Sequence, residues 1–351
     1  MTEAASIRVG VVGCGMGHSH ALGYALAAQE GANCQLVWVA DLDPARAQRT
    51  AEASGAAPAS DWTARLDEVD AVSICTPHHL HQPMAIQAMH AGKHVLVEKP
   101  LANTEADCRE MERVAREHDV RLMCALVMRY RPAPVWLKRA LDEQRWGPIH
   151  HISAWTHAFL EKPGLWFGKL GQLGGGVLFS HGCHYLDLIR WFMDAEPEQA
   201  AMVGSNLGAE WMEGEGTALC VMKFPGDKIA AYEASWARRN AALGGMHIHC
   251  RDALVITDYE TVEVVQGRRR VAERNVVFRT RQPGEPAVPG ASVVGEIKHF
   301  VECIAQHREP MTGVEDALKT LRIIWRMYET SGYGLTHPPR AAAPPSLAPA
   351  G

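Results

Sequence analysis

The chain has no excess of positive charge and no apolar run long enough to cross a bilayer. Its 351 residues carry 35 Lys and Arg against 40 Asp and Glu, a formal net charge of −5. Because there is no basic surplus to attract a phosphate backbone, we expect no nucleic-acid partner. The lack of a run of about 20 apolar residues predicts no membrane partner. With 47% hydrophobic and 21% charged residues, the composition is that of a globular protein.

The nine cysteines form no CxxC pair, and the 18 histidines form no HExxH motif. Five of the cysteines lie within apolar runs, which is typical of buried, reduced thiols. The local histidine clusters have no carboxylate or thiol at ligand spacing, so we expect no metal site. Residues 1–7 are acidic and lack a basic segment followed by an apolar one. These features predict a cytoplasmic protein without a signal peptide.

Short apolar runs rich in β-branched residues alternate with helical segments in the first 126 residues. The runs lie at residues 7–12, 35–40, 71–75, 94–97 and 120–127. The segments between them have the length and end signals of helices. This alternation predicts βαβ units and a parallel sheet, and we take residues 1–126 as a first domain.

The pattern changes after about residue 130. Strand-like runs with few helices between them follow at residues 150–155, 218–224, 229–236 and 254–258. Such runs predict an antiparallel sheet in a second domain, residues 127–337. Helices are expected at residues 182–193, 294–307 and 315–328. The segment 338–351 is rich in Pro and Ala, and we expect a loosely packed tail.

A glycine-rich turn follows the first predicted strand and consists of Gly13, Cys14, Gly15, Met16 and Gly17. Glycines let the backbone approach a pyrophosphate, whose charge the start of the next helix stabilises. The usual spacing is GxGxxG, whereas here the third glycine comes one residue early and His18 stands in its place. By spacing alone, a plain tight turn is an equal alternative.

Asp41 ends the second predicted strand. A carboxylate at this point accepts hydrogen bonds from both ribose hydroxyls and repels a 2′-phosphate. We therefore predict NAD as the preferred cofactor, with NADP as the alternative because Arg46 lies nearby. A turn-forming or helix-capping aspartate is the other interpretation.

Lys99 follows a short apolar run in the sequence HVLVEKPL. A lysine at the carboxyl edge of a parallel sheet points into the crevice where such sheets bind ligands. A cation there lowers the cost of forming an alkoxide on a substrate alcohol. The alternative is a solvated charge beside a helix, the usual state of a lysine.

Several motifs together resemble the Gfo/Idh/MocA oxidoreductase family. In the first half they are Gly13-Cys-Gly15, Asp41-Leu-Asp43-Pro44, Cys75-Thr-Pro-His-His-Leu-His81 and Ala91-Gly-Lys-His-Val-Leu-Val-Glu-Lys-Pro100, and in the second half Gly174-Gly-Gly176 and Gly182-Cys-His-Tyr-Leu-Asp187. The resemblance implies an N-terminal Rossmann domain and a C-terminal α/β domain with a large, mostly antiparallel sheet that builds homodimers or homotetramers. It also implies NAD(P)-dependent oxidation or reduction of sugars, cyclitols and related polyols.

The resemblance further implies roles for single residues. Lys99 matches the catalytic lysine of the EKP motif, His184 matches the histidine that accepts the proton, and Asp187 matches the aspartate one helical turn later. Arg129, near the crossing between the domains, is a candidate substrate contact. The positions that match the nicotinamide half of the cofactor site are Thr76, Pro77, His81, Glu98, Lys99 and Pro100. For His81, a helix-capping or supporting role is the alternative.

One position departs from the family pattern. Many sugar and inositol dehydrogenases of the family have an aspartate four residues before the histidine, and here that position is Ser180. Serine can hydrogen-bond to a substrate but supplies no charge, so it does not raise the basicity of His184 as a carboxylate does. Either His181, Asp187 or substrate contacts compensate, or the chemistry differs from that of a standard polyol dehydrogenase.

Trp155, Trp166 and Trp236 are candidate walls of a sugar pocket, because pyranose faces stack on aromatic rings. Ordinary packing is the alternative for each. We expect Gly174-Gly-Gly176 to let a loop pass close to cofactor or substrate. Specificity is expected in the loops at residues 155–172 and 237–247.

We expect hydride transfer between nicotinamide and a secondary alcohol of a sugar, glycoside or inositol-like cyclitol, with the reacting hydroxyl between Lys99 and His184. Two alternatives stay open. One is a glycoside hydrolase or lyase that uses tightly bound NAD in transient internal redox. The other is a non-enzymatic relative that binds NAD or sugar.

Overall fold

The structure is a computed structural model that describes residues 6–239, 244–267 and 272–334. Its first part is a parallel sheet of six strands in the order β3-β2-β1-β4-β5-β6. The strands are β1 (Ile7–Val12), β2 (Cys34–Ala40), β3 (Ala57–Ala59), β4 (Ala71–Ile74), β5 (His94–Glu98) and β6 (Leu122–Ala125). This order is that of a Rossmann domain and confirms the expected fold of the first part.

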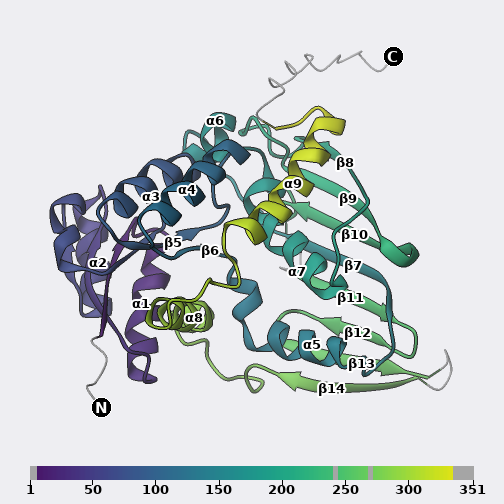
Figure 1. The fold of residues 1–351 in the computed structure, drawn as a ribbon. Coiled ribbons are helices and arrows are strands. Elements are labelled where there is room, and N and C mark those ends of the chain that lie inside the picture. The colour runs from purple at the N-terminus through teal and green to yellow at the C-terminus, as the bar shows by residue number, and fades with distance from the viewer. Residues whose placement is uncertain (1–5, 240–243, 268–271, 335–351) are drawn as a thin grey trace, which may run out of the picture.

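Helices cover both faces of this sheet (Figure 1), which is why its strands are nearly continuous apolar runs. The helices are α1 (Gly17–Gln29), α2 (Pro44–Ser54), α3 (His81–His90) and α4 (Glu105–Glu117). The strand order reverses between β1 and β4, so the crevice at their carboxyl ends is where such sheets bind ligands. Both the glycine turn and Asp41 lie at this edge.

α8 (Val294–Ala305) returns to the first sheet although it falls within residues 127–337. Its apolar side chains, among them Ile297 and Phe300, share a buried cluster with Val9 and Ala21. The helix has one apolar face, and α1 offers the apolar surface that buries it. Residues 127–337 are therefore not a single packing unit, a point that local patterns did not predict.

The second sheet has eight strands in the order β14-β13-β12-β11-β7-β10-β9-β8. They are β7 (Ile149–His157), β8 (Gln199–Ser205), β9 (Thr217–Phe224), β10 (Lys228–Ser235), β11 (Gly244–Cys250), β12 (Leu254–Thr257), β13 (Thr261–Gln266) and β14 (Glu273–Arg279). β7 and β10 pair in parallel, and the other pairs are antiparallel. The expected large, mostly antiparallel sheet is confirmed.

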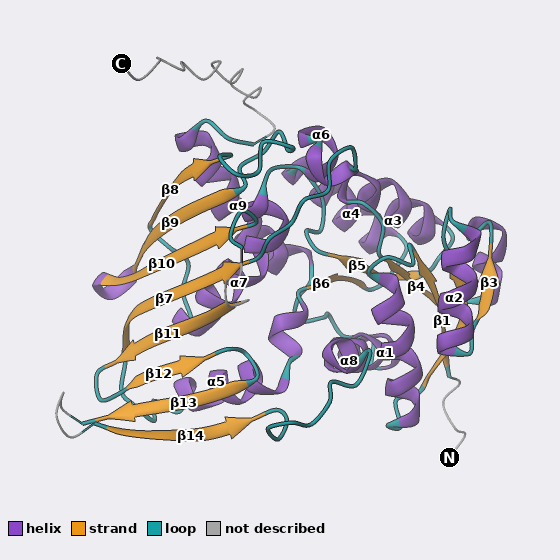
Figure 2. Ribbon diagram, turned by 180° about the vertical axis from the view of Figure 1, so that it is seen from behind, coloured by secondary structure: helices purple, strands orange, loops and turns teal. Residues whose placement is uncertain are grey.

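One face of the second sheet packs against α5 (Pro132–Asp142), α7 (Cys183–Met193) and α9 (Val314–Ser331). Figure 2 looks onto the opposite face, where none of the described helices lies. Along β9, Cys220 and Met222 are buried, whereas Leu219 and Val221 are 53% and 60% exposed. We call this opposite side the open face.

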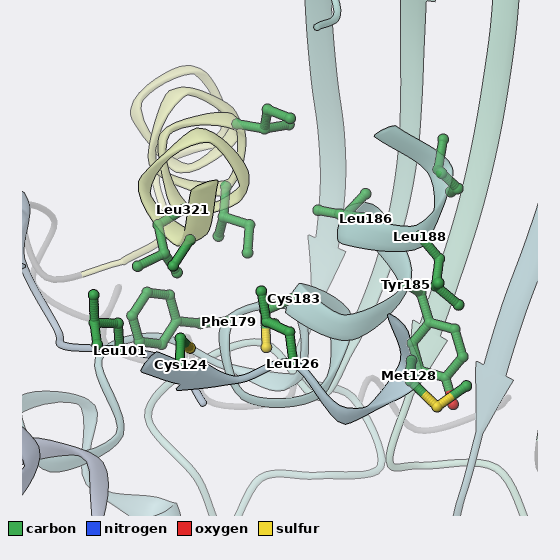
Figure 3. Close-up of a cluster of buried hydrophobic side chains, with 14 of the residues drawn as sticks. Leu101, Cys124, Leu126, Met128, Phe179, Cys183, Tyr185, Leu186, Leu188 and Leu321 are labelled. Carbon is green, nitrogen blue, oxygen red and sulfur yellow. The ribbon is translucent and has the colours of Figure 1, made fainter. Parts of the chain in front are cut away.

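A cluster of buried side chains joins the two parts of the chain (Figure 3). Leu101 and Leu126, which follow β5 and β6, meet Phe179 from the segment before α7 and Leu321 of α9. Residues Leu178–Gly182 form a π-helical turn that leads directly into α7. This packing holds the start of α7 against the carboxyl edge of the first sheet.

Several expectations concern absences or ends of the chain. None of the helices among the described residues is long and apolar enough to cross a membrane. All nine cysteines are free and buried. The part of the chain that the structure describes contains no group of three or more His, Cys, Asp or Glu side chains that could hold a metal ion. The tail at residues 338–351 lies outside the described residues, as do residues 240–243 of the second expected specificity loop.

Candidate functional site

Lys99 directly follows β5 and reaches toward the second half of the chain. Its Nζ donates a hydrogen bond to the carbonyl oxygen of Ser180, with 2.9 Å between the two atoms. The lysine is half-buried, so it is not a freely solvated charge. Lys99 and the π-helical turn before α7 therefore form one side of the site.

Glu98 provides the negative charge next to Lys99. Its Oε2 accepts a hydrogen bond from the Lys99 amide at 3.0 Å, and its Oε1 lies 3.2 Å from Nε2 of the fully buried His20. Burial alone raises the pKa of a carboxyl, but the hydrogen bond from His20 and the charges of His20 and Lys99 bring the pKa of Glu98 down to about 2. Glu98 is therefore ionised at neutral pH.

His184 lies in the first turn of α7. Burial lowers its pKa well below the ordinary value for histidine, and the positive charge of Lys99 lowers it further. An imidazole that is uncharged at neutral pH can accept a proton. Its Nδ1 is buried and has no hydrogen-bond partner among the described residues.

His181 is a second imidazole in this region. Its ring centroid lies 6.4 Å from that of His184, and its ring stacks on Tyr185. Burial, with the charge of Lys99, lowers the pKa of His181 to about 4. An imidazole is neutral or positively charged, so His181 does not supply the negative charge of the carboxylate that is missing at position 180.

Arg129 and Asp187 bond to each other in the structure. Arg129 Nε and Nη2 donate to the two carboxylate oxygens of Asp187 at 2.6 and 2.7 Å, and both side chains are buried. Thr320 also donates to Asp187 at 3.0 Å, and Arg129 forms a second ion pair with Asp316. The carboxylate of Asp187 is thus engaged by Arg129 and is not bonded to His184. These contacts show both residues supporting α7, and their direct roles in the reaction stay predictions.

The glycine turn fits a dinucleotide. Gly13 has a φ of +89°, and a Cβ there would lie 2.6 Å from the carbonyl oxygen of Cys75, so only glycine is accommodated. At Gly15 a Cβ would meet nothing within 4 Å, which leaves the outer side of the turn open. No side chain caps the N-terminus of α1 at Met16. The open turn and the uncapped helix start are suited to a pyrophosphate.

Asp41 lies beside this turn at the end of β2. Its Oδ2 accepts a hydrogen bond from the Cys14 amide at 2.7 Å, and its Oδ1 accepts one from the Asp43 amide at 2.8 Å. Arg46 Nη1 is 3.7 Å from Asp41 Oδ2. The helix cap of α2 is Asp43, not Asp41, so the capping interpretation of Asp41 is wrong.

Thr76 and Pro77 follow β4, and Pro100 follows Lys99 along the same edge of the sheet. His81 is fully buried between them, with Nδ1 2.8 Å from the Pro100 carbonyl oxygen and Nε2 2.9 Å from that of Thr76. Both ring nitrogens are occupied, so His81 braces these two segments and does not offer a nitrogen to the cofactor. The supporting role is the one that the geometry favours.

The three tryptophans occupy different places. Trp166 meets His78 edge to face, with ring centroids 4.7 Å apart, next to the segment after β4. Trp236 is buried and packs against Phe167. Trp155 lies on the open face of the second sheet with Ser153 and His157, because alternate residues of β7 point to opposite faces. Trp155 therefore lies on the face of β7 opposite α7, and its role as a wall of the sugar pocket stays a prediction.

Two residues of the site were not expected from the sequence. His20 contacts Glu98 across 78 positions, and His78 bonds the Leu173 carbonyl oxygen at 2.8 Å across 95 positions. His78 belongs to the CTPHHLH motif, which was the available signal. His20 lies in a helix without a recognisable motif, so no signal in the sequence indicated that it contacts Glu98.

Comparison with known proteins supports the same assignment. Residues 7–126 match the model of the oxidoreductase family with an NAD-binding Rossmann fold, and residues 135–256 match the GFO/IDH/MocA C-terminal domain. A 1,5-anhydro-D-fructose reductase from Ensifer adhaerens is 29% identical over 72% of this chain and 75% of its own length. A 2,7-anhydro-N-acetylneuraminate hydratase from Mediterraneibacter gnavus is 31% identical over 53% of this chain and 49% of its own length. For several of the curated relatives that it matches, the chain thus spans about half their length.

Solved structures share the fold across the chain. A levoglucosan dehydrogenase in complex with NADH and levoglucosan has a TM-score of 0.81 and 22% identity, over 93% of this chain and 98% of that one. A UDP-N-acetylglucosamine 3-dehydrogenase from Acidithiobacillus ferrooxidans has a TM-score of 0.76 and 26% identity, over 93% and 98% of the two chains. With the two domain matches and the NAD-binding turn, this chain belongs to the GFO/IDH/MocA family of oxidoreductases.

Proposed function

We propose that the protein is an NAD-dependent dehydrogenase that acts on a secondary alcohol of a sugar, glycoside or inositol-like cyclitol. The observation that carries the proposal is the hydrogen bond from Lys99 Nζ to the Ser180 carbonyl oxygen, 2.9 Å long, at the edge of the first sheet. It supports the proposal because the Lys99 ammonium acts electrostatically on the buried imidazole of His184. This pair suits the oxidation of an alcohol.

The two side chains have separate roles. His184 accepts the hydroxyl proton, since its lowered pKa keeps it uncharged at neutral pH. The Lys99 ammonium stabilises the negative charge that develops on the oxygen. Glu98 keeps the local charge balanced because it is ionised next to Lys99. Trp166, beside His78, is a candidate wall for the sugar ring.

The cofactor residues that we propose are those at the edge of the first sheet. Gly13, Gly15 and the uncapped start of α1 would hold the pyrophosphate, and Asp41 would hold the adenosine ribose. Thr76, Pro77 and Pro100 would border the nicotinamide. Bound nicotinamide supplies the hydride chemistry, and the protein supplies position and field.

The test is absorbance at 340 nm with NAD, and separately with NADP, against levoglucosan, inositols, aldoses and glycosides. The Lys99→Ala variant should lose about 10²–10⁴-fold in kcat on the substrate that responds, because the charge on oxygen is no longer stabilised. Lys319→Ala, which removes an exposed lysine of α9, is the matched control and should retain activity. Full turnover by Lys99→Ala, with cofactor still bound, would overturn the assignment.

A second candidate function is a hydrolase or lyase that oxidises a sugar carbon and reduces it again within one cycle. It is favoured by Ser180, which departs from the usual dehydrogenase pattern, and by the similarity to a 2,7-anhydro-N-acetylneuraminate hydratase. Under this alternative, purified protein contains NAD, and no NADH accumulates with any sugar while a new product forms. Mass spectrometry of the released cofactor and of the sugar products separates the two functions.

We also propose a homodimer or homotetramer that forms through the open face of the second sheet, and a cytoplasmic location. Leu219 and Val221 on β9 and Ile229 on β10 are each at least half exposed there. Exposed apolar side chains in a contiguous group are typical of association surfaces. The free cysteines are the form in which cytoplasmic thiols are kept.

A further inference from the structure

The π-helical turn that offers the Ser180 carbonyl to Lys99 has an unusual attachment at its beginning. A helix leaves its first four amides without partners inside the helix. Here these amides belong to residues 176–179, and two buried residues from distant segments accept their hydrogen bonds, three through side chains and one through a backbone carbonyl. The amides of Gly176 and Phe179 donate to the hydroxyl oxygen of Tyr328, at 3.1 and 3.2 Å.

Glu215 accepts the hydrogen bonds of the other two amides, those of Val177 and Leu178. Its backbone carbonyl takes the hydrogen bond of the Val177 amide at 2.8 Å, and its Oε1 takes that of the Leu178 amide at 3.0 Å. The Tyr328 hydroxyl donates in turn to Glu215 Oε1 at 2.8 Å. We call Glu215 and Tyr328 the clamp. One comes from the loop before β9 and the other from α9, so the clamp ties three segments together.

The clamp is buried, and burying its carboxyl group costs free energy of folding. Glu215 is fully buried, Tyr328 is 2% exposed, and Glu215 Oε2 has no hydrogen-bond partner among the described residues. Burial raises the pKa of Glu215 to about 7, even though its hydrogen bonds act in the opposite direction. An incompletely paired carboxyl inside a protein destabilises it. We therefore expect a function that explains why this carboxyl lies at the helix start beside the site.

Within Gly174-Gly-Gly176, the absence of side chains at Gly175 and Gly176 leaves room for Tyr328 and Glu215. A Cβ at Gly175 would lie 2.6 Å from the Tyr328 hydroxyl, and a Cβ at Gly176 would lie 2.3 Å from Glu215 Oε2. Gly174 has a φ of +92°. The close approach that we expected of these glycines is thus an approach to Glu215 and Tyr328, two groups of the protein itself.

The absence of an aspartate at position 180 makes the clamp important for Lys99. A side-chain carboxylate could adjust its torsions to follow the ammonium, but a backbone carbonyl cannot. The position of the Ser180 oxygen depends on the π-helical turn, and that turn begins at the clamped amides. His184 follows four residues later on the same continuous helix.

We propose that Glu215 and Tyr328 are positioning residues that hold the Ser180 carbonyl at Lys99 Nζ and set the place of His184. The inference rests on the proposed dehydrogenase function for its kinetic consequence, but the contact itself can be tested without activity. Neither residue touches the reacting atoms, so binding of cofactor should not depend on them.

Tyr328→Phe is the first test, because it removes one oxygen and retains the ring. We expect kcat to fall by about tenfold or more, as for small misplacements of reacting groups, with KM for NAD and NADH affinity within about twofold of wild type. The acylation rate of Lys99, followed by mass spectrometry with exposed Lys319 as reference, should rise several-fold. Tyr24→Phe is the matched control, since Tyr24 is equally buried and its hydroxyl bonds Ser73 at 2.9 Å.

An unchanged acylation rate in Tyr328→Phe overturns the inference, and so does a raised rate with unchanged kcat. Glu215→Gln is the second variant. It keeps an oxygen for the Leu178 amide and the Tyr328 hydroxyl, so it should keep Lys99 protected and most of kcat, whereas Glu215→Ala should resemble Tyr328→Phe. If the wild type oxidises no member of the sugar panel, the proposed function fails. The acylation rates would still show whether Glu215 and Tyr328 hold the Ser180 carbonyl at Lys99.

Discussion

Asp41 contacts the glycine turn and the start of α2 at the same time. Its two carboxylate oxygens each accept one backbone hydrogen bond, from Cys14 and from Asp43. Each oxygen retains a second lone pair that can accept a ribose hydroxyl. A single side chain therefore shapes the loop and, in our proposal, selects the cofactor.

Asp41→Asn should raise the ratio of kcat/KM for NADP over NAD by about tenfold. The variant removes the charge that repels a 2′-phosphate, whereas Arg46 keeps its ion pair with Asp43 at 3.6 Å. Steady-state kinetics with both cofactors measure the ratio. In the control Asp43→Asn the ratio should not move, because asparagine also caps a helix. If this ratio is unchanged in Asp41→Asn, Asp41 does not bind the adenosine ribose.

Glu215 predicts a pH dependence of stability. Its pKa of about 7 in the folded protein is above the ordinary value of 4.5. The folded state therefore binds more protons than the unfolded state between these values. Its contribution is fully present below pH 4.5 and is lost as the pH rises to about 7.

Across this range, the free energy of unfolding of the wild type should fall relative to Glu215→Gln by about 3 kcal/mol. Urea titrations at several pH values measure the difference. The control is Glu210→Gln, which changes an exposed glutamate of the same loop. Its free energy of unfolding should depend on pH as that of the wild type does. If the Glu215→Gln curve also ran parallel to wild type, the carboxyl of Glu215 would not be held in its protonated form.

At the scale of elements, a buried ion-pair network joins the segment after β6, α7 and α9. Arg129 pairs with Asp187 and Asp316, and Arg190 pairs with Asp316 at 2.6 Å. Arg129, Asp187 and Arg190 are buried, and Asp316 is 23% exposed, so the buried part of the network is screened little by salt. The network fixes the helix that carries His184 relative to the first sheet.

Asp187→Ala should lower the free energy of unfolding by about 3–5 kcal/mol, since it leaves Arg129 buried beside a cavity with a partner removed. Chemical denaturation measures the loss. The control is Glu117→Gln, which breaks an exposed ion pair with Arg113 on α4 and should cost less than about 1 kcal/mol. Equal losses in the two variants would contradict a structural role for the network.

At the scale of the whole molecule, the two sheets differ in how they are covered. Helices lie on both faces of the first sheet, whereas the described helices cover one face of the second (Figure 2). The alternation along β9 still places apolar residues on the open face. Apolar residues on the open face are what we expect if the proposed oligomer covers it.

Val221→Asp should dissociate the proposed oligomer, because it introduces a charge into the middle of that apolar surface. Sedimentation velocity should then show a smaller species than wild type at the same concentration. Val288→Asp, at an exposed valine in the segment between β14 and α8, should sediment like wild type. A monomeric wild type would end this part of the proposal.

The sequence was informative where a signal is local. β-branched runs and the EKP motif are recognised within a few residues, and they predicted the parallel sheet and the edge on which Lys99 lies. The residue type of Trp155 predicts packing, but only the register of β7 decides on which face it packs. The ion pair of Asp187 could not be predicted, because its partner Arg129 is 58 positions away.

What the sequence alone determined is the order of the elements and the NAD-binding turn, and it supplied Lys99 and His184 as the side chains that we propose to react. These depend on propensity, periodicity and motifs, which act over short stretches of chain. Only the tertiary structure decided that α8 joins the first sheet, that Lys99 donates to Ser180, and that Glu215 and Tyr328 hold the start of α7. Such contacts join residues far apart in sequence, and burial and hydrogen-bond pairing across the folded chain select them.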